Sequence, residues 1–360
     1  MASVKRAAFL LAAGVLAAGA GGAGAKEPPL YGTVSNANGV VLAHVDPGSL
    51  RPLGKGVAVG RDVVSWSFAP NRTKLAIGDG YGGKIRIVDL ARMRVRRTIG
   101  TVGVPVASAW LAPRRLVWAE PYRIVLVDPL TGRILRRSYT DAAVRRTARA
   151  ADSLVLLLAP EGKFGPAQLA VAGATGPVRI VTLDRVLAGT SSDEPVTIRL
   201  PGLAVDPETR RAFVIGGGEP IAEIDLATLS VRYHDVRTLA AASKGPLDGP
   251  ERIAAWLGNG LLAVAGSDHR DLVREGDTET MVTTRPSGLQ LVDTRTWQMR
   301  TLDPAATDLV VAGDRLLAFG RGIGLQVYGS DGFVDLGNGA VVGELLLPMP
   351  QLLVGDSALG

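Results

Sequence analysis

One unit of roughly 40 residues recurs along this chain, each time as an apolar strand, a short turn and a second strand. Ile85-Arg86-Ile87-Val88-Asp89 shows the pattern, with an apolar run that ends in the first residue of the turn. Seven such turns follow one another, at Asp46, Asp89, Asp128, Ala172, Asp225, Asp293 and about Gly329. The chain of 360 residues is therefore a tandem array of one supersecondary unit.

The unit has the content of one propeller blade. Upstream of most turns lies a second pair of apolar runs joined by a tight turn, as in Leu203–Asp206 and Ala212–Ile215. Each unit thus supplies four strands, which need about 40 to 50 residues. The sequence predicts an all-β fold, a seven-bladed β-propeller. Residues 31–53 supply only outer strands and residues 341–354 lack a following unit, so we expect the last blade to be closed by N- and C-terminal strands together.

At these residues the chain resembles the YVTN-type and WD-repeat-like propellers of exported bacterial proteins, in which a strand ending in Val-Asp precedes a turn such as Asp128-Pro129-Leu130-Thr131-Gly132. The resemblance covers nearly all of the chain after residue 25 and implies the fold. Its motif residues are turn and core residues, so it implies no catalytic role. The chain departs from the pattern at Ala172, where other repeats have Asp, and at the weak turn Tyr328–Asp331.

Residues 1–25 have the layout of a cleavable signal peptide. Lys5 and Arg6 precede the apolar stretch Ala7–Ala20, and Ala23-Gly24-Ala25 offers a small-x-small cleavage site. The alternative is a membrane anchor, although the stretch is short and rich in Gly and Ala for a span. We expect residues 26–360 to form a single propeller domain without a transmembrane segment, located in the periplasm, in the cell envelope or outside the cell.

Composition limits the available chemistry. The chain has no Cys and three His, which disfavours zinc, copper and covalent haem sites. Its 40 basic and 34 acidic residues are too evenly matched to indicate nucleic acid binding. Arginine runs such as Arg92–Arg97 and Arg133–Arg137 directly follow strand-turn units, which predicts outermost strands. They could form a polyanion-binding rim, but charge that protects exposed sheet edges explains them better.

The long segments between strands share one class of connection. With strands named a to d from the channel outward, the b–c turns and d–a connections lie on one face of a propeller, which we call the b–c/d–a face. Every long segment belongs to it, namely 159–166, 184–196, 237–251 and 267–287. Since long loops on a rigid scaffold commonly carry binding residues, the sequence predicts that this face binds the ligand.

Polar residues follow strand b in successive blades on the same face. The predicted binding residues are Asp79, Glu120, Glu161, Glu219, Asp268, His269, Arg270, Asp271 and Arg321. Asp356 continues the acidic series. No cofactor is predicted, although such carboxylates could coordinate Ca²⁺, with Asp79, Glu120, Glu219 and Asp268 as the candidate ligands. They could equally be solvated turn residues.

These observations favour a monomeric, non-enzymatic module that binds a protein, a peptide or an envelope glycan, with no catalytic residue. Some propellers similar to this one are lactonases or related hydrolases that hold a divalent cation at the channel mouth. A divalent-cation-dependent hydrolase is therefore the alternative. A third hypothesis is a structural ring that uses the sides of its blades in an envelope complex.

Overall fold

The computed structural model describes residues 30–36, 38–46, 51–192, 197–236, 250–275, 278–312, 315–320, 324–329, 335–338 and 351–352. These residues form strands and turns, with no helix among them. Within this part of the chain there is accordingly no helix that could span a membrane. The strands assemble into seven sheets, whose neighbouring strands run antiparallel.

The sheets are numbered in chain order. The first contains β1 (Leu30–Asn36), β2 (Gly39–Val45), β3 (Pro52–Gly60) and β30 (Gln351–Leu352). The second contains β4 (Val63–Phe68), β5 (Lys74–Asp79), β6 (Lys84–Asp89) and β7 (Arg94–Gly100). The third contains β8 (Ala107–Ala112), β9 (Arg115–Glu120), β10 (Arg123–Val127) and β11 (Ile134–Tyr139).

Two of the remaining sheets have five strands. The fourth contains β12 (Ala143–Ala150), β13 (Ser153–Ala159), β14 (Lys163–Gly173), β15 (Arg179–Thr190) and β16 (Ile198–Arg199). The fifth contains β17 (Gly202–Asp206), β18 (Arg211–Ile215), β19 (Ile221–Asp225) and β20 (Val231–His234). The sixth contains β21 (Glu251–Gly258), β22 (Leu261–Glu275), β23 (Thr278–Pro286), β24 (Leu289–Asp293) and β25 (Gln298–Asp303). The seventh contains β26 (Asp308–Ala312), β27 (Arg315–Gly320), β28 (Gly324–Gly329) and β29 (Asp335–Asn338).

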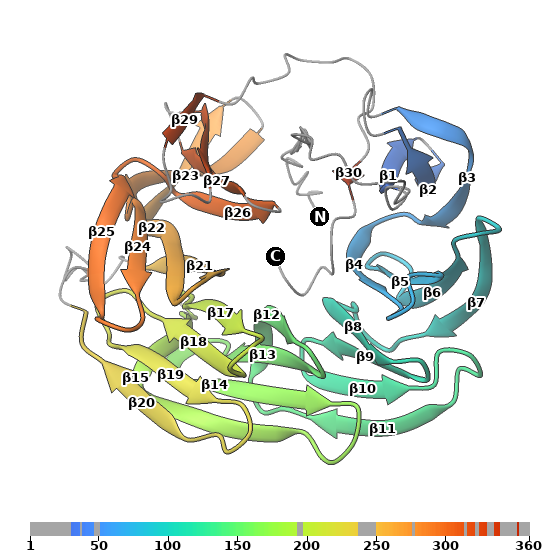
Figure 1. Ribbon diagram of the computed structural model, residues 1–360, viewed down its shortest axis with the longest axis horizontal. Helices are drawn as coiled ribbons and strands as arrows, with labels where there is room; N and C mark the ends of the chain where they lie inside the picture. Colours follow the sequence, from blue (N-terminus) through green and yellow to red (C-terminus); the bar gives the residue numbers. More distant parts are fainter. Residues whose placement is uncertain are drawn as a thin grey trace, which may run out of the picture.

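The sheets surround a common centre, with β4, β8, β12, β17, β21 and β26 innermost (Figure 1). Neighbouring inner strands contact each other, as β4 does β8 and β17 does β21. The chain is a β-propeller, as predicted. In the first sheet, β30 pairs with β1 through Gly32↔Leu352 and Thr33↔Gln351, so this sheet takes strands from both ends of the chain.

The recurrent Asp at the end of strand c shapes the c–d turn. In the fifth sheet, Asp225 Oδ1 accepts hydrogen bonds from the amides of Ala227 and Thr228, both at 2.8 Å. The amide of Leu229 then donates to the carbonyl of Asp225 at 2.8 Å, and Leu229 has a φ of 62°. Asp128 and Asp293 make the same closure with Gly132 and Trp297. A carboxylate that binds its own turn explains why this position recurs in sequence.

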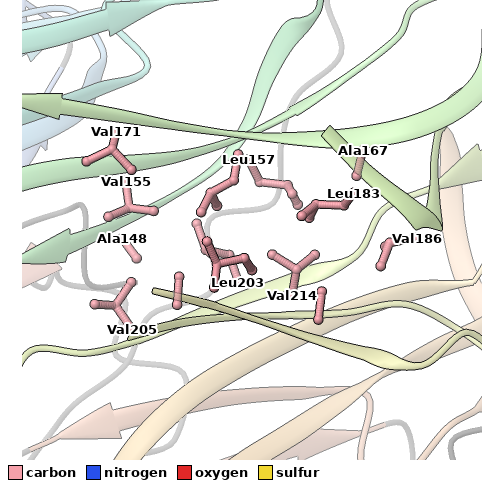
Figure 2. Close-up of a cluster of buried hydrophobic side chains, with 14 of the residues drawn as sticks. Ala148, Val155, Leu157, Ala167, Val171, Leu183, Val186, Leu203, Val205 and Val214 are labelled. Carbon is pink, nitrogen blue, oxygen red and sulfur yellow. The ribbon is translucent and has the colours of Figure 1, made fainter. Parts of the chain in front are cut away.

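Sheet faces pack against the next sheet, which buries the middle strands on both sides. All seven residues of β13 are buried. Figure 2 shows the cluster between the fourth and fifth sheets, where Val155, Leu157 and Leu183 face Leu203 and Val214. Each such side chain contributes about 1.5–3 kcal/mol when fully buried. The predicted outer position of the arginine runs is confirmed, since β7 and β11 are the outermost strands of their sheets.

The prediction of long irregular loops is wrong at three places. In segment 184–196, residues 184–190 belong to β15. Segment 159–166 contains only a three-residue turn, because β14 begins at Lys163 and pairs with the end of β15. Segment 267–287 is a hairpin in which β22 and β23 pair from Ser267↔Pro286 to Glu275↔Thr278. Hydrogen bonding between the two arms satisfies backbone groups that a loop would leave to water. Most of segment 237–251 lies outside the described residues.

Candidate functional site

The b–c/d–a face is built from turns that rest on one another. The amide of Gly80, in the β5–β6 turn, donates to the carbonyl of Asp62 in the β3–β4 connection at 2.8 Å. The amide of Val144 likewise donates to the carbonyl of Pro121 at 2.7 Å. At these two places a b–c turn is hydrogen-bonded to the chain segment that enters a sheet, which links neighbouring parts of this end of the ring.

All five predicted carboxylates that the structure describes form ion pairs with arginine. The pairs are Asp79–Arg86, Glu120–Arg123, Glu161–Arg145, Glu219–Arg199 and Asp268–Arg252. Four of the nitrogen–oxygen distances lie between 2.5 and 2.7 Å, and the Glu219 pair is at 3.4 Å. The sequence reasoning assigned none of these partners.

Asp79 ends β5 and is buried. Its Oδ2 accepts from Arg86 Nη1 at 2.7 Å, and its Oδ1 accepts from the amides of Arg61, Asp62 and Gly82 at 3.3 Å each. Burial raises the pKa of Asp79, but these hydrogen bonds outweigh it and hold the pKa below the usual value. Asp79 therefore anchors the connection that enters its own sheet.

Glu120 plays the same part in the third sheet. Its carboxylate accepts from Arg123 Nη2 at 2.6 and 2.7 Å and from Trp118 Nε1 at 3.0 Å. The amide of Gly103, in the β7–β8 connection, also donates to it at 2.9 Å. Glu120 therefore links β9 and β10 to the connection that enters their sheet.

Glu161 is more open and links two neighbouring turns. Arg145 Nη2 binds its Oε1 at 2.6 Å, and the hydroxyl of Tyr122 donates to its Oε2. This hydrogen bond is the main cause of the raised pKa of Tyr122.

Glu219 differs from the other carboxylates because its charge is poorly compensated. Its Oε2 is buried and has no hydrogen-bond partner among the described residues. Burial raises the pKa of Glu219, and Arg199 and Arg252 offset only part of that effect. A Cβ on Gly216 would lie 2.1 Å from Oε2, so the absence of a side chain at Gly216 makes room for this carboxylate.

Asp268 and Arg252 form the most buried of these pairs. Their side chains are 9% and 2% exposed, and Arg252 Nη2 binds Asp268 Oδ1 at 2.5 Å. Arg252 Nη1 donates to the carbonyls of Glu251 and Ser267, both at 3.1 Å. The pair joins β21 to β22.

The candidate metal ligands do not come together. Among the described residues, no three His, Asp or Glu side chains are placed so that they could hold a metal ion. His269, Arg270 and Asp271 lie on β22, with side chains outside the described part of the structure. Arg321 and Asp356 lie outside the described residues altogether.

A set of exposed aromatic side chains is the feature that sequence reasoning missed. Among the residues whose burial is described, four aromatics are exposed: Tyr81 (73%), Tyr122 (40%), Tyr139 (72%) and Phe164 (36%). All four lie at the b–c/d–a end of their sheets, in a b–c turn, at the end of β11 or at the start of β14. The spacing Asp79-Gly80-Tyr81 and Glu120-Pro121-Tyr122 could have revealed the first two.

A cavity of about 470 Å³ opens on the same face between the first and second sheets. It is lined by Asn38, Ala58, Gly60, Arg61, Asp79, Tyr81, Gly82, Lys84 and Arg86. Asp79 is thus the one predicted binding residue in this lining.

Comparison with known proteins identifies the fold and no family. No protein-family profile and no curated protein sequence matches the chain. The computationally designed Ika8 protein is 13% identical over 86% of both chains, with a TM-score of 0.53. BamB from Moraxella catarrhalis is also 13% identical, over 85% of this chain and 86% of its own, with a TM-score of 0.50. At this identity the likeness shows the propeller fold alone.

Proposed function

We propose that this chain is an exported propeller that binds a protein partner on its b–c/d–a face. The observation that carries the proposal is the gathering of Tyr81, Tyr122, Tyr139 and Phe164 on that face. Tyrosine is enriched where proteins meet, because it buries a large apolar surface and keeps a polar tip for hydrogen bonding. When a partner covers the exposed aromatic rings of this face, apolar surface is removed from water, which favours binding.

The ion pairs support this function indirectly. Asp79, Glu120 and Asp268 fix the turns and connections around them, so the face is rigid before a partner arrives. A rigid surface loses less conformational entropy on binding than a loose one. We expect Tyr81 and Tyr122, which follow Asp79 and Glu120 by two residues, to act as anchors that each contribute about 2 kcal/mol or more.

The architecture proposed for this function is a seven-bladed ring closed by β30 and β1. The seven sheets and the pairing of Gly32 with Leu352 support it. Export by a signal peptide at residues 1–25 belongs to the same proposal, and residues 26–360 would then form the one binding domain.

Site-specific photo-crosslinking tests the binding face. A photoreactive phenylalanine derivative replaces Tyr122 in one variant and Leu130 in another, and both are expressed in the native host. Leu130 is a matched control, since it is 46% exposed against 40% for Tyr122 and lies in the β10–β11 turn on the opposite face. We expect a discrete protein adduct from position 122 only. Adducts of equal yield from both positions, or only from position 130, would refute the proposed face.

The alternative of a divalent-cation-dependent hydrolase has less support. Its candidate ligands Asp79, Glu120, Glu219 and Asp268 are each paired with arginine, and Ca²⁺ would have to displace a guanidinium at each one. Stoichiometric metal in the purified protein would favour this alternative over a binding module.

A further inference from the structure

We propose that the cavity between the first and second sheets binds the carboxylate of an acidic side chain, Asp or Glu, from the protein partner. This inference rests on the proposed function, because the cavity opens on the b–c/d–a face beside Tyr81. The inference adds a chemical class of ligand, because exposed aromatic residues alone indicate a binding surface without specifying what it binds.

Two glycines keep the floor of the cavity open. A Cβ on Gly60 would lie 2.7 Å from Asp79 Oδ2 and 2.9 Å from Arg86 Nη1. A Cβ on Gly82 would lie 2.6 Å from the same carboxylate oxygen. Gly60 also has a φ of 145°, which residues with side chains rarely adopt. Any larger residue at either place would fill the approach to the Asp79–Arg86 pair.

Arg86 is held in a position to bind an anion. Its Nη1 donates to the carbonyl of Val59 at 2.6 Å and to Asp79 Oδ2 at 2.7 Å, which fixes the guanidinium plane. Neither Nε nor Nη2 of Arg86 has a hydrogen-bond acceptor among the described residues. These two nitrogens form the edge of a guanidinium that binds a carboxylate with two parallel hydrogen bonds.

The rest of the lining is also cationic. Lys84 and Arg61 line the cavity, and neither forms an ion pair with a carboxylate in the described part of the chain. The Arg61 guanidinium instead lies 5.0 Å from the centre of the Tyr81 ring. With three cations and one carboxylate, the lining has a formal excess of two positive charges. Since Arg86 and three amides compensate the Asp79 charge, Arg61 and Lys84 supply the excess positive charge that attracts an anion to the open edge of Arg86.

The size and composition of the cavity favour an acidic side chain over a larger anion. A volume of about 470 Å³ lies in the lower part of the range for ligand sites and holds one residue of a partner with ease. Tyr81 offers apolar surface at the rim for the methylene groups that precede a carboxylate. The backbone of the partner would then run over the neighbouring aromatic residues.

The test measures binding of a fluorescein-labelled hexaglutamate peptide by fluorescence anisotropy at low ionic strength. Variants Arg86→Lys, Lys84→Gln and Arg61→Gln are compared with Lys74→Gln, which changes a lysine at the other end of the same sheet, where β5 begins. We expect Arg86→Lys to weaken binding about 10-fold, because it loses hydrogen bonds to a charged group. Lys84→Gln and Arg61→Gln should each weaken it about 3-fold, and Lys74→Gln should leave it unchanged.

Three outcomes would overturn the inference. They are no saturable binding of hexaglutamate to the wild type, equal loss in Lys74→Gln and Lys84→Gln, and tighter binding of an oligogalacturonate than of hexaglutamate. Because Lys84 and Arg61 are exposed, their variants remain informative if Arg86→Lys does not fold. If Tyr122 crosslinks as expected while hexaglutamate fails, the cavity is wrongly assigned and the protein-binding face stands. If the crosslink fails, the face itself is wrong whatever hexaglutamate does.

Discussion

Replacing Arg252 with Met should destabilise the propeller more than any substitution on its surface. The Arg252 side chain is 2% exposed and neutralises Asp268, whose side chain is 9% exposed. Methionine approximates the aliphatic part of the arginine but carries no donor. Arg252→Met therefore leaves a buried carboxylate without its cation and removes one hydrogen-bond donor from each of two carbonyls, those of Glu251 and Ser267.

Breaking a buried ion pair from one side costs about 3–5 kcal/mol, because the remaining charge is desolvated and uncompensated. In a protein larger than about 250 residues, each kcal/mol lowers the melting temperature by roughly 2 °C. The expected fall for Arg252→Met is therefore about 6–10 °C. The double variant Arg252→Met/Asp268→Leu removes both charges and should lose clearly less than Arg252→Met alone.

Urea unfolding followed by tryptophan fluorescence gives the free energies of unfolding of the wild type, Arg252→Met, Asp268→Leu and the double variant. Arg94→Met on β7 serves as the control for loss of an exposed arginine and should change stability by less than about 0.5 kcal/mol. The reasoning fails if Arg252→Met costs less than about 1 kcal/mol, or if the double variant costs the sum of the two single changes.

Two further predictions concern the poorly compensated charge of Glu219 and the closure of the ring by β30. Glu219→Gln should stabilise the protein by roughly 1 kcal/mol at pH 7, because it removes a charge whose Oε2 is buried without a partner. Burial raises the pKa of Glu219, so its carboxyl group binds a proton more tightly in the folded state than in the unfolded state. The free energy of unfolding therefore falls as the pH rises from the pKa of the unfolded state through that of the folded state. The stabilisation by Glu219→Gln should disappear at pH 4. The urea midpoints of both proteins at pH 7 and pH 4 measure it, and equal stabilisation at the two pH values would contradict an uncompensated charge on Glu219. Deleting residues 351–360 removes β30 and should lower the urea midpoint far more than deleting 353–360, which keeps the pairing with β1. Equal midpoints for the two deletions would argue against closure by the chain ends.

The propeller fold could be predicted from sequence because its repeat has a local physical cause. Asp225 and Asp293 bind the amides of their own turns, so the residue that marks each unit is fixed by contacts within a few positions. The continuous apolar runs of strands such as β13 follow from burial on both faces. Both signals can be recognised in short stretches of the sequence.

The hairpin of β22 and β23 could not be predicted in the same way. Its sequence is dense in charge, as in Asp268-His269-Arg270-Asp271, which suggested a loop. Charged residues are compatible with a two-stranded ribbon that projects beyond its sheet, because both of its faces can meet water. Hydrophobic alternation, the signal on which strand prediction depends, is absent from such a ribbon.

The ion pairs of the predicted carboxylates were not predicted from sequence, because the arginine partner of each carboxylate is determined by the folded structure. Arg123 lies opposite Glu120 in the register of its hairpin, whereas the register places Lys84 opposite Asp79 and Arg86 two residues farther along the same strand. Arg252 and Arg145 lie on inner strands, and no local spacing connects them with Asp268 and Glu161. The described carboxylates are thus bound by arginines, and their role in binding a ligand stays a prediction.

This distinction changes how the b–c/d–a face should be understood. A ring of free carboxylates would repel one another and would need a cation to stay rigid. When each carboxylate is paired with an arginine, its charge is compensated by that guanidinium. The pair then holds the neighbouring turn in place. The side chains that these turns and connections expose to a partner include the aromatic rings of Tyr81 and Tyr122. They also include Arg61 and Lys84, which form no ion pair with a described carboxylate. Among the described residues of this face, each predicted carboxylate is paired with an arginine, and the surface that we propose for binding consists of aromatic rings beside a cavity with an excess of positive charge.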